Sequence, residues 1–161
     1  MNMEKVVLMD TLKNNTDYSK TAEDYFEQGY NCAQSVLLTF AEEINMDKET
    51  VLKLSSSFGG GMGRLREVCG AVSAMFMVAG ILKGYTAPND DLVKQKHYEL
   101  IQQLANTFKE QYGTIICKEL LGEAGKDTSS KPSKRTESYY NERPCKYFIG
   151  FCAKIITEKL I

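Results

Sequence analysis

Apolar residues recur along most of this chain at the three- and four-residue spacing that is typical of amphipathic α-helices. The stretch that contains Val36, Leu37, Phe40, Ala41 and Ile44 is a clear example. Only three prolines occur in the chain, and each falls in an expected loop or at an expected helix start. The pattern therefore predicts an all-α protein.

Capping residues divide this pattern into separate helices. Asn31, with Gln34 three positions later, resembles a capping box, and Asp47 is placed to cap the next helix. Gly113 and Gly122 are placed to end later helices. We expect helices over about residues 19–28, 32–44, 48–54, 69–83, 90–112, 115–121 and 145–161.

The helix expected over about residues 69–83 is apolar nearly all round its circumference. A helix without a polar face is buried on every side, so this one should lie at the centre of the protein. It is also shorter than the ~20 residues that a membrane-spanning helix needs. Because the chain shows no internal repeat, we expect one domain over residues 1–161, a helical bundle around this central helix.

Three segments fall outside the helical pattern. Residues 1–16 are weakly determined, because their short apolar stretch suits either a strand or part of a helix. Residues 122–143 are polar and rich in Lys, Ser, Thr and Glu, which predicts an exposed loop within the domain. Glycines occupy positions 59, 60, 61 and 63. Since each glycine costs about 1 kcal/mol in a helix interior, we expect a loop of unusual backbone shape there.

Composition narrows the possible functions. The formal net charge is −1, so charge gives no reason to expect nucleic acid or an anionic membrane as a partner. No apolar run is long enough to span a bilayer, and Glu4 and Asp10 flank an N-terminal apolar stretch that is a poor match to a signal peptide. We therefore expect a cytoplasmic protein, whose cysteines are free, metal-bound or catalytic rather than paired in structural disulfides.

The cysteines carry the candidate chemistry. Four of the five, Cys32, Cys69, Cys117 and Cys145, fall where helices are expected to begin. The first turn of a helix has unpaired N–H groups and a partial positive charge, which favour the reactive, metal-binding thiolate form. Four cysteines alike in setting but distant in sequence predict one site built from four elements. The fifth, Cys152, falls inside the last helix.

Several kinds of site remain open from the spacing. No Cys-x-x-Cys pair occurs, which argues against a thioredoxin-like dithiol and a usual zinc ribbon. Four thiolates suit an iron–sulfur cluster before zinc, and without a metal the same thiols could cycle between thiol and disulfide. In that last case Cys69 is the expected attacking residue, aided by its helix N-terminus and by Arg66. If the protein is an enzyme, it is a thiol- or cluster-based oxidoreductase.

A non-redox interpretation is also open. Buried cysteine often serves as a small apolar side chain, so the protein could be a non-catalytic helical interaction module with inert cysteines, or a structural zinc-binding domain. A redox site would instead require an unidentified redox partner protein. The small size favours a homodimer.

Residues close to the cysteines are candidates for a supporting role. Arg64 and Arg66, just before Cys69, suit thiolate stabilisation and a solvated loop equally well. The glycine loop is expected mainly to present Cys69, with its N–H groups as alternative donors to thiolate or cluster sulfur. The candidate cofactor-binding residues are Gly59, Gly60, Gly61, Gly63, Arg66 and Gly70.

These segments together resemble a family described as redox-active and named for its C_GCAxxG_C_C pattern of cysteines and glycines. The similarity extends from about residue 29 to the C-terminus, over residues 29–34 (GYNCAQ), 58–63 (FGGGMG), 69–72 (CGAV), 116–122 (ICKELLG) and 143–145 (RPC). The resemblance implies that Cys32, Cys69, Cys117 and Cys145 are the family cysteines. It also implies an association with electron transfer, since some relatives are joined to haem and iron–sulfur carriers. One departure is Ala74, where the family commonly has glycine.

Overall fold

The computed structural model describes residues 16–161, so the expectation for residues 1–15 lies outside the described residues. The chain forms the helices α2 (Tyr18–Glu27), α3 (Cys32–Thr39), α4 (Lys48–Ser56), α5 (Gly59–Met62), α6 (Gly70–Lys83), α7 (Asp91–Tyr112), α8 (Cys117–Leu121), the 3₁₀ helix η1 (Gly122–Lys126), α9 (Glu137–Glu142) and α10 (Cys145–Lys159). Over residues 16–161 there is no β-strand, and the predicted all-α fold is confirmed.

The capping residues act as the sequence predicts. Asn31 is the N-cap of α3, and its Oδ1 accepts from the Gln34 N–H while Gln34 Oε1 accepts from the Asn31 N–H, which completes the capping box. Asp47 caps α4 by accepting from the Thr50 N–H. Local side-chain chemistry therefore sets the start of both helices.

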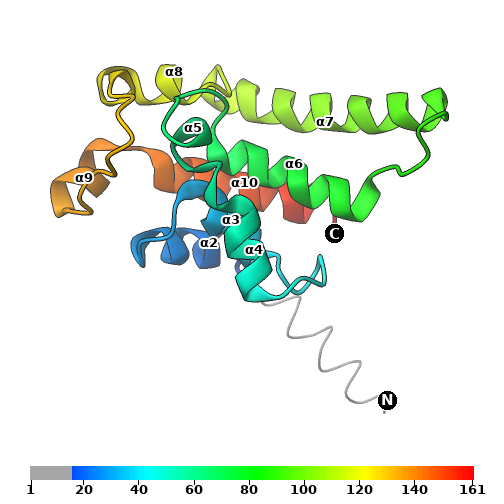
Figure 1. Ribbon diagram of the computed structural model, residues 1–161, viewed down its shortest axis with the longest axis horizontal. Coiled ribbons are helices and arrows are strands. Elements are labelled where there is room, and N and C mark those ends of the chain that lie inside the picture. The colour runs from blue at the N-terminus through cyan, green and yellow to red at the C-terminus, as the bar shows by residue number, and fades with distance from the viewer. Residues whose placement is uncertain (1–15) are drawn as a thin grey trace, which may run out of the picture.

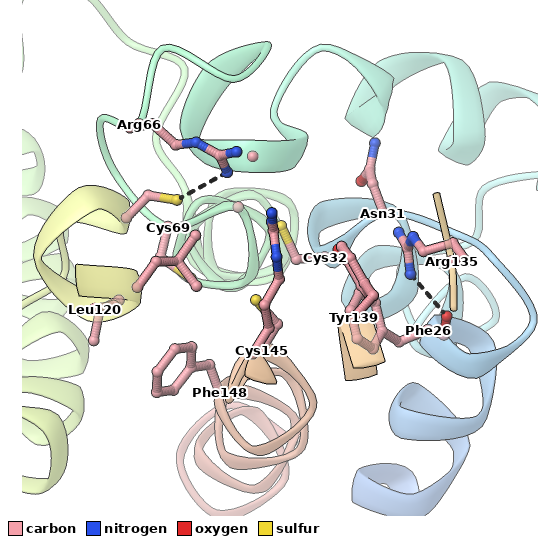
Figure 2. Close-up of a pocket in the computed structure, with 15 residues that line it drawn as sticks. Phe26, Asn31, Cys32, Arg66, Cys69, Leu120, Arg135, Tyr139, Cys145 and Phe148 are labelled. Carbon is pink, nitrogen blue, oxygen red and sulfur yellow. Dashed lines mark hydrogen bonds between the residues drawn. The ribbon is translucent and has the colours of Figure 1, made fainter. Parts of the chain in front are cut away.

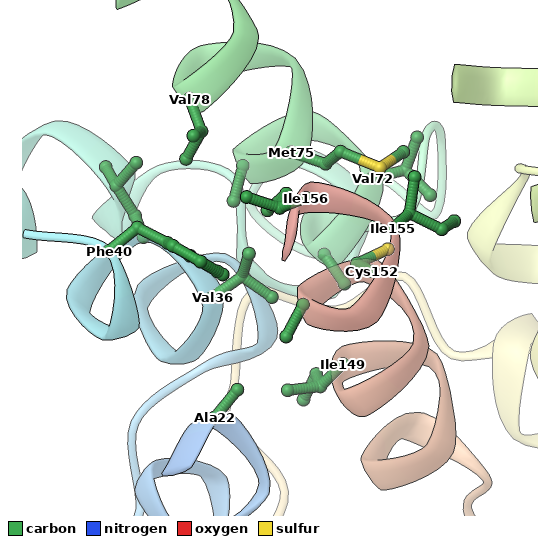
Figure 3. Close-up of a cluster of buried hydrophobic side chains, with 14 of the residues drawn as sticks. Ala22, Val36, Phe40, Val72, Met75, Val78, Ile149, Cys152, Ile155 and Ile156 are labelled. Carbon is green, nitrogen blue, oxygen red and sulfur yellow. The ribbon is translucent and has the colours of Figure 1, made fainter. Parts of the chain in front are cut away.

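Helix α6 lies in the middle of the bundle, with α3, α7 and α10 packed around it (Figure 1). Its residues Ala71, Val72, Ala74, Met75, Val78 and Ala79 are buried and pack with side chains of α3 and α10 (Figure 3). The prediction of a buried central helix is confirmed for this part. It is wrong for the last turn, where Ile81 is 55% exposed because α6 extends past the core.

Helix α7 is only half supported by the rest of the protein. Leu104 and Phe108, in its second half, are fully buried against the core. Val93 and Tyr98, which the periodicity places on the inward stripe, are 43% and 50% exposed, so the expectation is wrong for the first half. A loop over residues 84–90 joins that half to the end of α6, and the two helices diverge toward this loop (Figure 1). Among the helices of residues 16–161, none combines the length and apolar character that a membrane crossing requires.

The polar segment over residues 122–143 is not a plain loop. It contains the 3₁₀ helix η1 and the short helix α9, which Thr136 caps by accepting from the Tyr139 N–H. Most of the segment is exposed, but Arg135, Tyr139 and Arg143 are partly buried. The composition indicated solvent exposure and missed these inward side chains.

The glycine-rich segment forms a left-handed turn, drawn as α5. Gly60 (φ 67°, ψ 28°) and Gly61 (φ 68°, ψ 57°) have left-handed backbone angles, and φ is also positive at Met62 and Arg64. Only glycine adopts this conformation without strain, and a side chain costs about 1–2 kcal/mol there. The predicted unusual backbone is confirmed, and it leads the chain directly to Arg66.

Candidate functional site

Four helix starts bring the predicted cysteines to one pocket (Figure 2). Cys32, Cys117 and Cys145 are the first residues of α3, α8 and α10. Cys69 is the N-cap of α6, because this helix begins at Gly70, one residue later than expected. The sequence prediction that these four cysteines share one site thus agrees with their placement around a common pocket.

Two glycines, which have no side chain, let the cysteine-bearing segments approach each other closely. A Cβ on Gly70 would lie 2.5 Å from Cys32 Sγ, so the start of α6 and the start of α3 touch through this glycine. A Cβ on Gly61 would lie 2.6 Å from Cys117 Cβ. The left-handed turn therefore packs directly against the third cysteine.

Main-chain hydrogen bonds join the segments that carry Cys69 and Cys117. Val68 and Ile116 form an isolated antiparallel bridge. The Cys69 N–H donates to the Ile115 carbonyl at 2.8 Å, and the Cys117 N–H donates to the Glu67 carbonyl at 2.6 Å. The relative position of these two cysteines is consequently set by backbone groups.

The pocket is small and mostly enclosed. Its volume is about 60 Å³, which has room for a few water molecules. The residues that line it are Phe26, Asn31, Cys32, Gly60, Arg66, Cys69, Gly70, Cys117, Leu120, Leu121, Arg135, Tyr139, Arg143, Cys145 and Phe148. No Asp, Glu or His is in this lining, so thiols and guanidinium groups are its only ionisable side chains apart from one tyrosine.

Arg66 is the most deeply buried charged side chain of the described residues. It is 2% exposed, although the sequence suited a solvated loop residue equally well. Its Nε donates to the Asp127 carbonyl and its Nη1 donates to Cys117 Sγ at 3.8 Å. Its Nη2 is buried and has no hydrogen-bond partner among residues 16–161. The thiol to which Arg66 donates a hydrogen bond is thus Cys117, whereas the sequence suggested support for Cys69.

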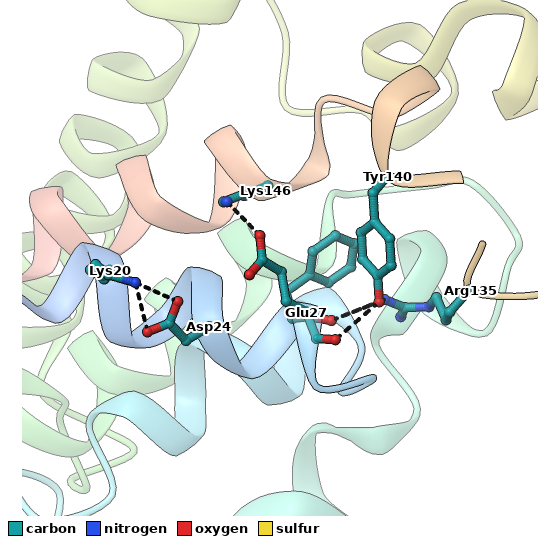
Figure 4. A network of polar contacts seen from close by, with 7 residues as sticks. Lys20, Asp24, Glu27, Arg135, Tyr140 and Lys146 are labelled. Atoms are coloured by element: carbon teal, nitrogen blue, oxygen red, sulfur yellow. Dashed lines mark hydrogen bonds and ion pairs between the residues drawn. The ribbon is translucent and has the colours of Figure 1, made fainter. Parts of the chain in front are cut away.

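Two further arginines face the cysteines from the segment before α10. Arg135 donates to the carbonyls of Phe26 and Tyr30, and its guanidinium carbon lies 4.5 Å from the centre of the Phe26 ring (Figure 2). Its Nη1 also donates to the Tyr140 hydroxyl, which lies beside it in Figure 4. Arg143 donates to Ser133 and stacks on Tyr139 at 4.6 Å. Within the described part of the chain, neither arginine forms an ion pair. Their charge therefore acts on the pocket.

Burial controls the protonation of the pocket cysteines. It raises the pKa of the Cys69 thiol well above its usual range, and the neighbouring Cys32 raises it further. Burial also raises the pKa of Cys117, against the hydrogen bond from Arg66, which lowers it. For Cys145 burial raises the pKa to about 12, although Arg143 and Arg135 oppose the rise. The expectation that helix starts would favour thiolates is wrong for these three, because desolvation outweighs the helix dipole.

The cysteines have soft donor atoms but are not yet grouped as ligands of one ion. Over residues 16–161, no three Cys, His, Asp or Glu side chains are close enough together to hold a metal ion. All five cysteines are free, and the fifth, Cys152, is fully buried in the core. Each cysteine sulfur turns about a single side-chain torsion, so small rotations change their separations.

The other candidate residues are divided between the pocket and its support. Gly60, Arg66 and Gly70 line the pocket, whereas Gly59, Gly61 and Gly63 lie outside the lining. Sequence reasoning gave no role to Arg143, although it precedes Pro144 and Cys145 directly. Arg135 and Tyr139 fall in the polar segment over residues 122–143, which was expected to be an exposed loop.

The fold and the site define a class: an all-α protein with four cysteines around one positively charged pocket. Residues 30–159 match the family described as "Putative redox-active protein (C_GCAxxG_C_C)". The chain belongs to this redox-active C_GCAxxG_C_C family. Comparison with curated proteins gave no match. Comparison with solved structures gave none either.

Proposed function

We propose that the pocket holds an iron–sulfur cluster on Cys32, Cys69, Cys117 and Cys145, and that the protein transfers electrons. The observation that carries the proposal is that four cysteines from four helix starts line one pocket without a carboxylate. Four cysteine thiolates are the usual ligand set of iron–sulfur clusters. When bound, such a cluster supplies reversible one-electron transfer.

The protonation of the thiols favours a metal centre over a free nucleophile. Burial raises the pKa of Cys69, Cys117 and Cys145, so at neutral pH these thiols are protonated and react slowly as nucleophiles. Metal binding removes the thiol proton and does not need a low pKa. The charges of Arg66 and Arg143 offset the negative charge that four thiolates would bring.

The donor set fits the cluster in chemistry, and its geometry requires the sulfurs to move. In the described residues no three ligands already surround one ion, so the cysteine side chains have to rotate toward the pocket. Arg66 Nη2 has a free hydrogen available for sulfur at this position. Hydrogen bonds to cluster sulfur raise the reduction potential.

The test is metal analysis of protein expressed and purified without oxygen. We expect visible absorption together with iron and acid-labile sulfide in matched amounts, all lost in Cys69→Ala. The control is Cys152→Ala, which removes the fifth cysteine, buried outside the pocket lining, and should keep the iron. Zinc without iron would instead identify a structural zinc site, and metal-free protein would exclude the cluster under those conditions.

A thiol–disulfide site is the second candidate, and the placement of two cysteines favours it. Cys32 Sγ packs against Gly70, the residue that follows Cys69, and the charge of Cys32 contributes to the raised pKa of Cys69. In this case the two thiols form a disulfide, release two protons and pass two electrons to a disulfide of a partner protein. Peptide mapping after equilibration with oxidised glutathione tests it, since a Cys32–Cys69 peptide pair is expected. Thiols that stay unmodified and unpaired throughout would point to an inert interaction module.

Either redox role requires a partner protein as electron donor or acceptor. We propose a cytoplasmic location, because an odd number of cysteines without a close pair suits a reducing compartment. A homodimer also stays a prediction, for which the exposed Leu92 and Ile81 beside the α6–α7 end offer apolar surface. Sedimentation analysis of the reduced protein decides it.

A further inference from the structure

The cysteine pocket concentrates positive charge. Arg66, Arg135 and Arg143 line it, and no carboxylate does. The carboxylate of Asp127, whose pKa is lowered mainly by hydrogen bonds and also by the charge of Arg66, pairs with Arg64 and lies outside the lining. A buried cation is costly without a group of opposite charge beside it, so an anion inside the pocket would complete the site.

Arg66 offers that group a specific hydrogen-bond donor. Its Nε and Nη1 are used by the Asp127 carbonyl and by Cys117 Sγ, whereas Nη2 has no partner among the described residues. The side chain is 98% buried and lines the pocket, so the free donor is not simply in contact with solvent. A guanidinium group with free N–H hydrogens matches the oxygen atoms of a carboxylate or phosphate group.

The N-terminal ends of two helices add to the positive charge around the pocket. Helices α6 and α10, of 14 and 15 residues, both begin at the pocket, and neither N-cap makes a side-chain hydrogen bond. The start of a helix carries about half a positive charge and unpaired N–H groups. Both helix starts and three arginines therefore favour an anion at the same place.

We propose that the pocket binds a small oxyanion, with Arg66 as its principal hydrogen-bond donor and Arg143 as a second cation. The ligand class is set by size and charge: a volume of about 60 Å³ fits an anion of a few heavy atoms and excludes a nucleotide. This inference rests on the proposed function in taking the pocket as the working site. It concerns the metal-free thiol form of that site, because Arg66 Nη2 cannot serve cluster sulfur and an oxyanion at once. It adds that the substrate or effector of this form is an oxyanion held beside the thiols.

The position of Cys117 shows how binding would reach the redox chemistry. Its sulfur accepts from Arg66 Nη1, and this hydrogen bond lowers the pKa of the thiol. An anion on Nη2 shares the same guanidinium group and offsets part of its charge. Occupancy of the oxyanion site is thereby linked to the hydrogen bond between Arg66 and Cys117.

The test is anion binding to reduced, metal-free, full-length protein, measured by isothermal titration calorimetry at constant ionic strength. Phosphate and acetate are the probes, and chloride is the reference anion. We expect saturable binding of at least one probe, weakened about tenfold or more in Arg66→Met. Arg143→Met should weaken it less. Arg64→Met is the matched control, because Arg64 comes from the same turn but pairs with Asp127 outside the pocket lining.

A second measurement keeps the proposal testable if Arg66→Met fails to fold. This measurement is the rate at which Cys117 is alkylated in the wild-type protein and in Arg143→Met. A bound probe should slow the reaction with the anionic reagent iodoacetate more than it slows the reaction with neutral iodoacetamide. The proposal is overturned if neither phosphate nor acetate binds saturably. It is also overturned if Arg64→Met weakens anion binding as much as Arg66→Met does. Because no metal is involved, these results are independent of the iron and sulfide analysis. A failed oxyanion site and a failed redox centre are thus distinguished.

Discussion

Arg66 donates a hydrogen bond to Cys117 across a nitrogen–sulfur distance of 3.8 Å, inside a part of the protein where Arg66 is 2% exposed. The two residues come from segments 51 positions apart, which the main-chain bonds around Val68 and Ile116 hold together. Among the described residues, Cys117 is the only pocket thiol that accepts a hydrogen bond from a guanidinium group. The donor is Arg66, whose Nη2 is also buried without a partner.

Replacing Arg66 should make Cys117 less acidic. The hydrogen bond and charge of Arg66 both lower the pKa of this thiol, against burial, so Arg66→Met should shift its alkylation profile to higher pH. The rate of iodoacetamide modification at Cys117, followed by mass spectrometry against pH, measures the shift. Arg64→Met serves as the control and should leave the profile in place. An unchanged profile in Arg66→Met would show that the hydrogen bond does not control this thiol.

Alanine at position 70 should destabilise the protein. A Cβ there would lie 2.5 Å from Cys32 Sγ and 2.6 Å from the Phe58 carbonyl oxygen, so the start of α3 has to move. We expect a loss of about 1–3 kcal/mol in the free energy of unfolding by urea. Gly80→Ala is the control in the same helix, since nothing lies within 4 Å of a Cβ at that position. Alanine should stabilise the helix there by about 0.5–1 kcal/mol, and equal effects at the two positions would contradict this account.

Removing the cap of α3 should affect both stability and Cys32. Asn31 Oδ1 accepts from the Gln34 N–H, and Asn31 Nδ2 donates to the Ser56 carbonyl. Asn31→Ala should therefore cost about 1–2 kcal/mol, and it should change the alkylation rate of Cys32 because that residue begins the helix.

The matched control for Asn31→Ala is Asp47→Ala. Asp47 caps α4 through the Thr50 N–H, away from the pocket lining. It should cost a similar free energy of unfolding and leave the rate at Cys32 unchanged. A change in both variants would indicate general loosening of the fold instead of local positioning.

The reduced, metal-free protein should become less stable in alkaline solution. Burial holds the pKa of Cys152 well above its usual value, so the unfolded chain releases this proton at a lower pH than the folded protein does. The stabilisation is complete below about pH 8.5, the pKa of an unfolded cysteine, and decreases as the pH rises toward the folded pKa. Urea unfolding over a series of pH values measures the decrease.

Cys152→Ala isolates the contribution of this thiol. The variant should lose stability less steeply above pH 8.5, by up to about 1.4 kcal/mol per pH unit. Its stability below pH 7 reports the separate cost of the smaller side chain. Identical slopes in the variant and the wild-type protein would mean that Cys152 ionises as easily in the folded state as in the unfolded chain.

The success of the sequence predictions depended on how local the underlying interaction was. The capping box of Asn31 and Gln34 spans three residues, and the sequence alone predicts it. The start of α10 at Cys145 likewise follows from the preceding proline. Helix starts then placed the four cysteines in comparable settings, which is why they were recognised as one candidate site.

The missed features depend on contacts between distant segments. Arg135 bonds to the carbonyl of Phe26, which is 109 positions away, and no local pattern distinguishes it from a solvated arginine. The raised pKa of Cys69 arises from burial, which a helix start does not reveal. The first half of α7 has an apolar stripe, but the core ends before reaching it. Sequence periodicity shows which face is apolar, and not whether a partner covers it.

Helices α6 and α7 form a helical hairpin between Val68 and Ile116. Because a main-chain bridge joins these two residues, the site does not depend on the length of the hairpin. Cys69 and Cys117 are fixed to each other at the base, so the outer end of α6 and the first half of α7 contribute nothing to their spacing. Whole turns could be removed from that outer end, or a reporter group inserted there, without moving the backbones of Cys69 and Cys117 relative to each other. The exposed end of the hairpin is therefore the natural attachment point for a fluorophore or an electrode linker.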